Sequence, residues 1–171
     1  MNSTLRFETA TIDDIPALQH LAHRIWHAHY PGIITVEQID YMLAEGYSAD
    51  GIATEITGQG VTWLNIFDDK KLIGFAAFGP YGGQTVKLHK LYLDVTCHGK
   101  GIGSAALAEV EQRASSDGAT AIILNVNKYN HKAIASYERN GYQVADSVVH
   151  DIGNGFVMDD YVMRKVLLKI G

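Results

Sequence analysis

The sequence predicts a mixed α/β fold, with α+β character, in which one sheet contains both parallel and antiparallel strands. Two observations support this prediction. Hairpin signals stand at both ends of the strand-forming part of the chain, at the polar loop 68–71 and at Asn154-Gly155, a dipeptide typical of two-residue hairpin turns. Between them, a strand, a glycine-rich loop and a helix precede the apolar run 121–126, which is typical of a strand covered on both faces. Antiparallel strands at both ends exclude a doubly wound sheet.

The N-terminal part is predicted to contain one short strand followed by helices. Thr11 and Asp14 resemble a helix N-cap, and apolar residues with a 3.6-residue period follow until Pro31-Gly32. Thr35 and Gln38 form a second candidate cap. The elements expected here are a strand at 5–9, a helix at 15–29, a helix around 39–43 and a shorter helix from 48 to 56.

From residue 61 the apolar period changes from that of a helix to that of strands. Residues 80–83 (PYGG) are expected to form a turn, because Pro and Gly favour turn geometry. The remaining elements expected are strands at 61–67, 72–78, 85–95, 121–126, 143–152 and 156–166 and helices at 102–116 and 131–140. The whole chain is thus predicted to hold about seven strands and about four longer helices.

Composition predicts one globular domain over residues 1–171. Apolar residues make up 47% of the chain and charged residues 19%, which excludes a disordered protein. The single cysteine, Cys97, excludes an internal disulfide framework and suits a reducing compartment. The sequence has no apolar run of about 20 residues and no signal-peptide pattern at its start. We therefore expect a cytoplasmic protein with no membrane partner.

Charge is distributed unevenly along the chain. The formal net charge is −5, which argues against a nucleic-acid-binding protein. Segments 87–100 and 127–139 together hold six Lys or Arg residues and two acids, whereas the rest of the chain holds eight bases and seventeen acids. Two positive segments in a negative chain indicate one anionic ligand and one cationic ligand. Chance clustering on solvated faces is the alternative.

A glycine-rich loop joins a strand to a helix at residues 98–103 (HGKGIG). Glycines let a ligand approach the backbone, and the N–H groups at a helix N-terminus favour anions such as phosphate. The loop is not a P-loop, because it lacks the Gly-Lys-Ser/Thr ending, and its spacing differs from the dinucleotide fingerprint. On this loop alone, a turn without a ligand is the alternative.

Three segments, in the same order, resemble the GNAT superfamily of acetyl-CoA-dependent N-acetyltransferases. The loop matches the family pattern Gln/Arg-x-x-Gly-x-Gly/Ala at Gly101 and Gly103, with His98 in place of Gln or Arg. Residues 130–142 (NHKAIASYERNGY) resemble the family segment N-x-x-A-x-x-x-Y-x-x-x-G-F/Y, and residues 158–165 resemble its last strand. The resemblance covers nearly the whole chain and implies a GNAT-like sheet that splays between its fourth and fifth strands.

The resemblance implies that acetyl-CoA, as co-substrate, binds where strands 87–95 and 121–126 separate. Backbone groups of the first strand would pair with the pantetheine arm, and the glycine loop would hold the pyrophosphate. Phosphates would favour a protonated His98, so CoA affinity is expected to weaken as the pH rises. The cofactor-binding residues expected are Leu91, Leu93, His98, Gly99, Lys100, Gly101, Ile102, Gly103 and Asn130.

In the family, a neutral amine attacks the thioester directly, so the amine must lose a proton and the departing thiolate must gain one. Tyr137 occupies the family's general-acid position, and a phenol is a suitable donor to a thiolate. Packing as a core aromatic is the alternative for Tyr137. Asn125 stands where some members carry a glutamate base and cannot act as one. His89, on the first splayed strand next to Lys90, is the expected base, directly or through water, and a surface or packed histidine without this role is the alternative.

Two further groups are expected to carry no chemistry. His20, His23 and His27 share a helix face, and the last two have the spacing of metal ligands. That face lies opposite the apolar face, and no acidic or cysteine ligand is nearby in the sequence, so we predict no metal site. Cys97 precedes the glycine loop, but direct transfer needs no acyl-enzyme.

Acceptor sites in this family are formed by the first two helices, their connection and the last hairpin. Here those parts resemble a bacterial branch that includes spermidine/spermine acetyltransferases, and their aromatic and acidic groups suit a protonated amine. The acceptor-binding residues expected are Trp26, Tyr30, Asp40 and Asp160, with Asp159 on the other face of its strand. The alternatives are a protein N-terminal or lysine acetyltransferase and a non-catalytic acyl-CoA-binding module. A homodimer is compatible with the sequence.

Overall fold

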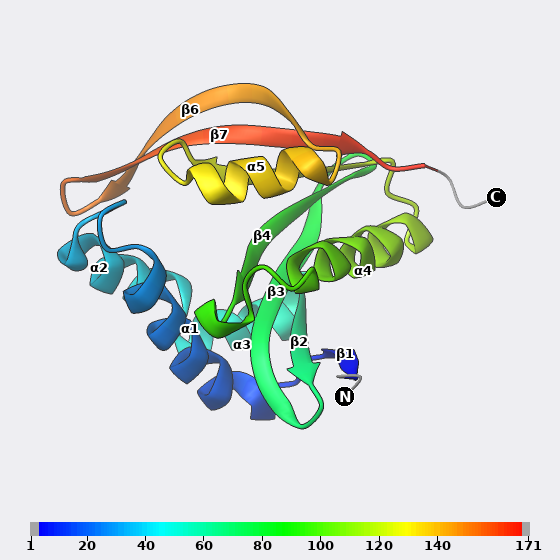
Figure 1. Ribbon diagram of the computed structural model, residues 1–171, viewed down its shortest axis with the longest axis horizontal. Coiled ribbons are helices and arrows are strands. Elements are labelled where there is room, and N and C mark those ends of the chain that lie inside the picture. Colours follow the sequence, from blue (N-terminus) through cyan, green and yellow to red (C-terminus); the bar gives the residue numbers. More distant parts are fainter. Residues whose placement is uncertain (1–3, 169–171) are drawn as a thin grey trace.

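The computed structural model describes residues 4–168, and these contain one seven-stranded sheet (Figure 1). The strands are β1 (Leu5–Thr9), β2 (Thr62–Asp68), β3 (Lys71–Gly82), β4 (Thr85–Leu93), β5 (Ala121–Asn127), β6 (Gln143–Gly153) and β7 (Phe156–Val166). Their order in the sheet is β1-β2-β3-β4-β5-β7-β6, and only β4 and β5 are parallel neighbours. The predicted mixed sheet of seven strands is confirmed.

The described part of the chain has five α-helices, and each lies where a helix was predicted, including the one after residue 48. They are α1 (Ile15–His29), α2 (Val36–Gly46), α3 (Ala49–Gly58), α4 (Ile102–Ser116) and α5 (His131–Arg139). The side chains of Thr35 and Ser48 cap α2 and α3 by accepting the N–H groups of Gln38 and Gly51, each at 3.1 Å. Each cap contributes about 1 kcal/mol. None of these helices is long and apolar enough to cross a membrane.

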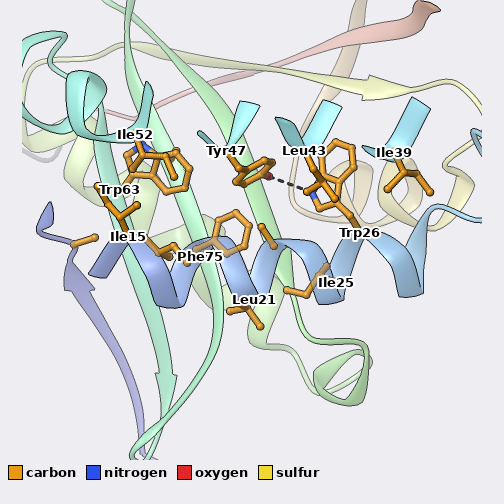
Figure 2. Packing of buried hydrophobic residues seen from close by; sticks show 14 of the residues in the cluster. Ile15, Leu21, Ile25, Trp26, Ile39, Leu43, Tyr47, Ile52, Trp63 and Phe75 are labelled. Atoms are coloured by element: carbon orange, nitrogen blue, oxygen red, sulfur yellow. Dashed lines mark hydrogen bonds between the residues drawn. The ribbon is translucent and has the colours of Figure 1, made fainter. Parts of the chain in front are cut away.

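Helices cover both faces of the central strands. On one face, α1, α2 and α3 pack against β2 and β3, where Trp63 and Phe75 join Trp26 and Tyr47 in an aromatic cluster (Figure 2). On the other face, α4 packs against β2 to β5, and α5 contacts the same apolar cluster. Burial of one large apolar side chain contributes about 1.5–3 kcal/mol, so the two clusters hold the sheet between its helices.

One predicted turn lies in the wrong place. Pro80 and Tyr81 belong to β3, and the chain reverses at residues 83–84. The β3–β4 pairing is irregular between Pro80 and Gly82, and this end of the hairpin is exposed. An exposed, irregular strand end tolerates a proline, which has no N–H group to donate.

Candidate active site

β4 and β5 run parallel for a short distance and then separate. Residues Thr85–Leu88 of β4 pair with β5, and the pairing stops there although β4 continues to Leu93. Beyond Leu88, β4 still pairs with β3, and β5 still pairs with β7. One edge of β4 is therefore open over Leu91 and Leu93, and its backbone groups are available to a ligand that adds to the sheet like a strand. This opening is the predicted splay.

A bulge in β4 coincides with this separation. The β3–β4 register shifts between Ala77 and Phe78, so His89 has no partner in the ladder. A bulge of this kind bends the strand and increases its twist. His89 is exposed at the bulge. Partial burial of its imidazole, with Lys87 and Lys90 close by, lowers the pKa of His89, so the ring is neutral at pH 7 and is able to accept a proton.

The glycine loop turns the chain from β4 into α4. Gly99 and Gly101 both have φ of 77°, a conformation that only glycine adopts readily. Gly103 differs, because a Cβ placed on it would meet Leu93 at 3.7 Å, an ordinary contact. Packing within the protein therefore does not require a glycine at 103. The first N–H groups of α4 have no acceptor inside the helix. Because the neighbouring glycines have no side chain, a phosphate is able to approach these N–H groups closely.

A buried carboxylate anchors the start of this loop. Asp94 caps the one-turn 3-10 helix Val95–Cys97 by accepting hydrogen bonds from the N–H group (3.1 Å) and hydroxyl (2.9 Å) of Thr96. Arg24 of α1 forms an ion pair with Asp94 at 2.6 Å. Burial opposes ionisation of Asp94, but these partners outweigh it and lower its pKa. Sequence analysis missed this pair, because α1 and the loop meet only in the folded chain.

His29 of α1 lies between His98 and Asn130. The Nε2 of His98 is 3.1 Å from the carbonyl oxygen of Leu93, and its ring centroid is 6.2 Å from that of His29. Asn130 is buried, and its side chain accepts the N–H of Ala133 at 3.4 Å to cap α5. Burial lowers the pKa of His29, so its neutral Nε2 accepts the Asn130 amide at 3.2 Å. Asn130 therefore fixes α5 against α1 next to the loop.

Three tyrosines from different elements converge at the splay. The hydroxyl of Tyr30, which ends α1, lies 3.0 Å from that of Tyr92 on β4. Burial raises the pKa of Tyr30 to about 12. Burial and the proximity of Tyr30 raise the pKa of Tyr137, on α5, well above its ordinary value. All three phenols therefore stay protonated at neutral pH, and the raised pKa makes each of them a weaker acid than a free phenol.

Asp160 is a buried carboxylate beside these tyrosines. It lies on β7 opposite Asn127 of β5, beyond the last β4–β5 pair, and it is 4% exposed. Burial raises the pKa of Asp160, while His150 and a hydrogen bond from Asn125 act against this rise, and its charge raises the pKa of Tyr30. Its Oδ1 has no hydrogen-bond partner among the described residues. A buried oxygen of this kind is costly unless a ligand satisfies it.

Strand alternation separates Asp160 from its neighbour. Asp159 forms an ion pair with Lys128 and is partly exposed, as its predicted position on the other face of the strand requires. Trp26 was also predicted to bind the acceptor. It is 4% exposed and donates its indole N–H to the Tyr47 hydroxyl at 3.1 Å. Trp26 therefore supports Tyr30 from behind, with ring centroids 4.5 Å apart.

Asp40 does not join the group at the splay. It is exposed on α2, and its Oδ1 lies 2.8 Å from the Nε2 of His27. His23 completes a cluster in which the three possible ligand atoms lie within 4.8 Å of one another. The prediction of no metal site considered only acidic ligands nearby in the sequence, and Asp40 is 13 residues from His27 in the chain. Packing of α2 against α1 supplies a carboxylate that sequence proximity does not reveal.

The splay thus brings together Tyr30, Tyr137 and Asp160 from the predicted set. It also adds Tyr92, which sequence analysis missed although strand alternation places it on the face of β4 that packs against α1. The charged groups that act on His89 are Lys87, Lys90 and Glu55. Lys87 also acts on the pKa of Asp160, so it is a charged group that His89 shares with the cluster at the splay.

Comparisons with known proteins point to one family. The model of the acetyltransferase (GNAT) family matches residues 18–142. A spermidine N(1)-acetyltransferase of Thermoplasma acidophilum is 28% identical over 160 residues, which cover 91% of this chain and 96% of that protein. An uncharacterized N-acetyltransferase of Mycobacterium tuberculosis is 26% identical over 155 residues, which cover 91% of this chain and 99% of that protein.

Solved structures agree with this comparison. A crystal structure of the PaiA N-acetyltransferase from Thermoplasma acidophilum, in complex with coenzyme A, has a TM-score of 0.82 and 26% identity and covers 95% of this chain and 99% of that chain. The ribosomal-protein-S18-alanine N-acetyltransferase from Escherichia coli has a TM-score of 0.73 at 20% identity and covers 98% of this chain and 97% of its own. The second likeness is one of fold.

Proposed function

Because this chain belongs to the acetyltransferase (GNAT) family, we propose that it transfers the acetyl group of acetyl-CoA directly to a primary amine of a small cationic acceptor. The observation that carries the choice of acceptor is the buried Asp160, whose Oδ1 lacks a partner beside the tyrosines at the splay. A protonated amino group is the ligand that best satisfies such an oxygen. The relative named as a spermidine N(1)-acetyltransferase supports this chemistry.

Acetyl-CoA is proposed to bind in the opening between β4 and β5. The open edge of β4 at Leu91 and Leu93 would pair with the pantetheine arm. The N–H groups of residues 98–103 would hold the pyrophosphate, and the exposed Lys100 would add charge at the rim. The coenzyme A complex of the PaiA structure, which has the same fold, supports this assignment.

The proposed reaction has one covalent step. The neutral amine nitrogen attacks the thioester carbon, a C–N bond forms, the C–S bond breaks, and the sulfur leaves with the electron pair. Tyr137 donates its phenolic proton to the thiolate and is reprotonated from water. His89 is the proposed base that takes the proton of the amine through water, because its lowered pKa leaves it neutral. Tyr30 and Tyr92 hold the site without changing charge.

Asp160 is proposed to bind a second, protonated amino group of the acceptor. One amine must be neutral to attack, so a compound with two amino groups presents a nucleophile and a cation together. The carboxylate of Asp160 would bind the cation through Oδ1, next to the Tyr30 ring, and ring faces also attract cations. Diamines and polyamines have this arrangement, whereas a neutral monoamine lacks the cation.

An acceptor screen tests the proposal. Release of free CoA from acetyl-CoA is measured with spermidine, spermine, short diamines, a neutral monoamine and peptides that offer an N-terminus or a lysine. We expect turnover with the compounds that carry two amino groups. Turnover only with peptides would show that the acceptor is a peptide or protein amine, and the acetyltransferase assignment would stand. Binding of acetyl-CoA without turnover on any amine would instead indicate an acyl-CoA-binding module.

A further inference from the structure

We propose that His23, His27 and Asp40 form a binding site for one divalent transition-metal ion of the zinc class, which joins α1 to α2 away from the splay. His23 and His27 are one helical turn apart on α1, and their rings are stacked with centroids 4.2 Å apart. Asp40 of α2 is the third residue, and its Oδ1 lies 2.8 Å from the Nε2 of His27. The three possible ligand atoms lie within 4.8 Å of one another.

The hydrogen bonding of His27 orients it as a ligand. Its Nδ1 lies 2.9 Å from the carbonyl oxygen of His23. A carbonyl oxygen only accepts, so Nδ1 carries the hydrogen, and a neutral ring then has its lone pair on Nε2. At 2.8 Å the Asp40 carboxylate only accepts, so in the metal-free chain a second proton on Nε2 donates to it. A divalent cation between the two residues would replace that proton and bind the Nε2 lone pair and the carboxylate together. A backbone carbonyl bound to the second ring nitrogen is also what metal-ligating histidines usually have.

The donor set selects the class of metal. Two imidazoles and one carboxylate suit zinc and its neighbours better than magnesium or calcium, which prefer oxygen ligands alone. Zinc–nitrogen bonds are about 2.0–2.1 Å, so two ligands of a tetrahedral ion lie about 3.3 Å apart. The separation of His27 and Asp40 must then widen by about half an ångström and His23 must move inward. All three are surface side chains of well-formed helices, so these movements need no backbone change.

The location of the site suggests its role. α1 ends at Tyr30, at the splay, and α2 holds the β6–β7 hairpin through Tyr41, whose hydroxyl donates to the carbonyl of Ile152 at 2.7 Å. Gln38 of α2 also donates its side-chain amide to the carbonyl of Val157 at 3.0 Å. An ion that links α1 to α2 would therefore stabilise the corner to which the hairpin is attached. We assign it a structural role that is separate from acetyl transfer.

Zinc binding to the purified full-length chain tests the site. The metal-free protein is titrated with Zn²⁺ in competition with a chromophoric chelator, and Co²⁺ absorption reports the coordination geometry. We expect one equivalent of zinc, intense visible Co²⁺ bands typical of a tetrahedral ion, and a melting temperature that rises with zinc concentration. Each of His23→Ala, His27→Ala and Asp40→Asn should weaken zinc binding about tenfold or more and abolish the rise in melting temperature.

His20→Ala is the matched control, because it removes an imidazole from the same helix face without touching the cluster. Its zinc affinity should equal that of the unmodified chain. Equal zinc affinity in the unmodified chain, His23→Ala and His27→Ala would overturn the proposal and leave a plain His27–Asp40 ion pair. An equal loss of zinc affinity in His20→Ala would also overturn the proposal. Zinc would then bind to any of the histidines on this helix face and not to one defined site. Melting in EDTA verifies that every variant is folded.

Discussion

The two sides of the splay are built from different parts of the chain. On the proposed CoA side, the groups available to a ligand are backbone: the open edge of β4, two glycines with φ of 77°, and the N-terminus of α4. On the proposed acceptor side they are the side chains of Tyr30, Tyr92 and Asp160, and Tyr137 lies between the two sides. These four residues come from α1, β4, β7 and α5. A backbone site needs one short segment with the right conformation. A side-chain site needs four elements packed in register.

This difference predicts how the two sides respond to change. Substitutions on the CoA side should alter the affinity for acetyl-CoA and leave the acceptor constants unchanged. Substitutions on the acceptor side should do the reverse. Tyr137 stands between the two sides, so its effect should fall on turnover alone. Any variant whose effect appears on both substrates would break the separation.

Tyr137→Phe should have the largest effect. We expect kcat to fall at least tenfold, because the thiolate loses its proton donor, while the dissociation constant of acetyl-CoA changes little. Steady-state assays at saturating substrates give kcat, and titration of the protein with CoA gives the dissociation constant. Tyr129→Phe, an exposed tyrosine in the preceding turn, is the matched control. Unchanged kcat in Tyr137→Phe would remove Tyr137 from the chemistry.

Gly103→Ala sharpens the description of the CoA side. Alanine is favoured over glycine in a helix by about 1 kcal/mol, and its Cβ would only touch Leu93 at 3.7 Å. The variant should therefore keep or gain thermal stability. Its affinity for acetyl-CoA should change little, because the family pattern that the loop resembles has either glycine or alanine at this position. A large fall in this affinity would show that the ligand needs the bare backbone of Gly103. Gly46→Ala at the end of α2, where no contact lies within 4 Å, should leave CoA affinity unchanged.

The same contrast explains what the sequence could predict. The glycine loop and the order of helices and strands along the chain were predicted from local patterns, whereas the splay and the role of Tyr137 were predicted from the family resemblance. The ion pair of Arg24 with Asp94, the contact of Tyr92 with Tyr30 and the approach of Asp40 to His27 were missed. Each joins residues from two elements whose relative position depends on packing.

Burial was also not predictable from residue type. Trp26 and Asp160 were both expected to face the acceptor, since aromatic and acidic groups suit a cation. In the structure both are 4% exposed, but Trp26 has a partner for its indole N–H and Asp160 has an oxygen without one. Within residues 4–168, Asn65 and Asp159 also each have a buried oxygen without a hydrogen-bond partner, so the missing partner points to Asp160 only together with its place beside the tyrosines at the splay.

Asp160→Asn should raise the Michaelis constant for spermidine several-fold and hardly change that for acetyl-CoA. The same variant should be more stable at neutral pH. Burial raises the pKa of Asp160, so ionising this carboxylate costs folded-state stability at pH values above that pKa, and the cost vanishes below about pH 4, where both states are protonated. Removing a cost of about 1 kcal/mol raises the melting temperature by about 2–4 °C.

Asp159→Asn is the control for this prediction, because Asp159 lies on the other face of β7 and pairs with Lys128. Its Michaelis constant for spermidine should match that of the unmodified chain. Melting curves of both variants at pH 4.5 and pH 8 provide the second readout. An Asp160→Asn protein with an unchanged spermidine constant would show that Asp160 serves the fold and not the acceptor.

His98→Arg should give the smallest effect, because an exposed charge near a phosphate contributes about 0–1 kcal/mol. Histidine changes charge between pH 5 and 8, so the affinity of the unmodified chain for CoA should fall by up to about fivefold from pH 6 to pH 8. Arginine keeps its charge and should flatten this profile. Burial lowers the pKa of His29, the neighbouring imidazole, so His29 carries less charge than a free histidine at the acidic end of this range. His131→Arg, an exposed histidine at the start of α5, should keep the slope of the unmodified chain. Identical profiles for all three proteins would mean that backbone donors and Lys100 bind the pyrophosphate alone.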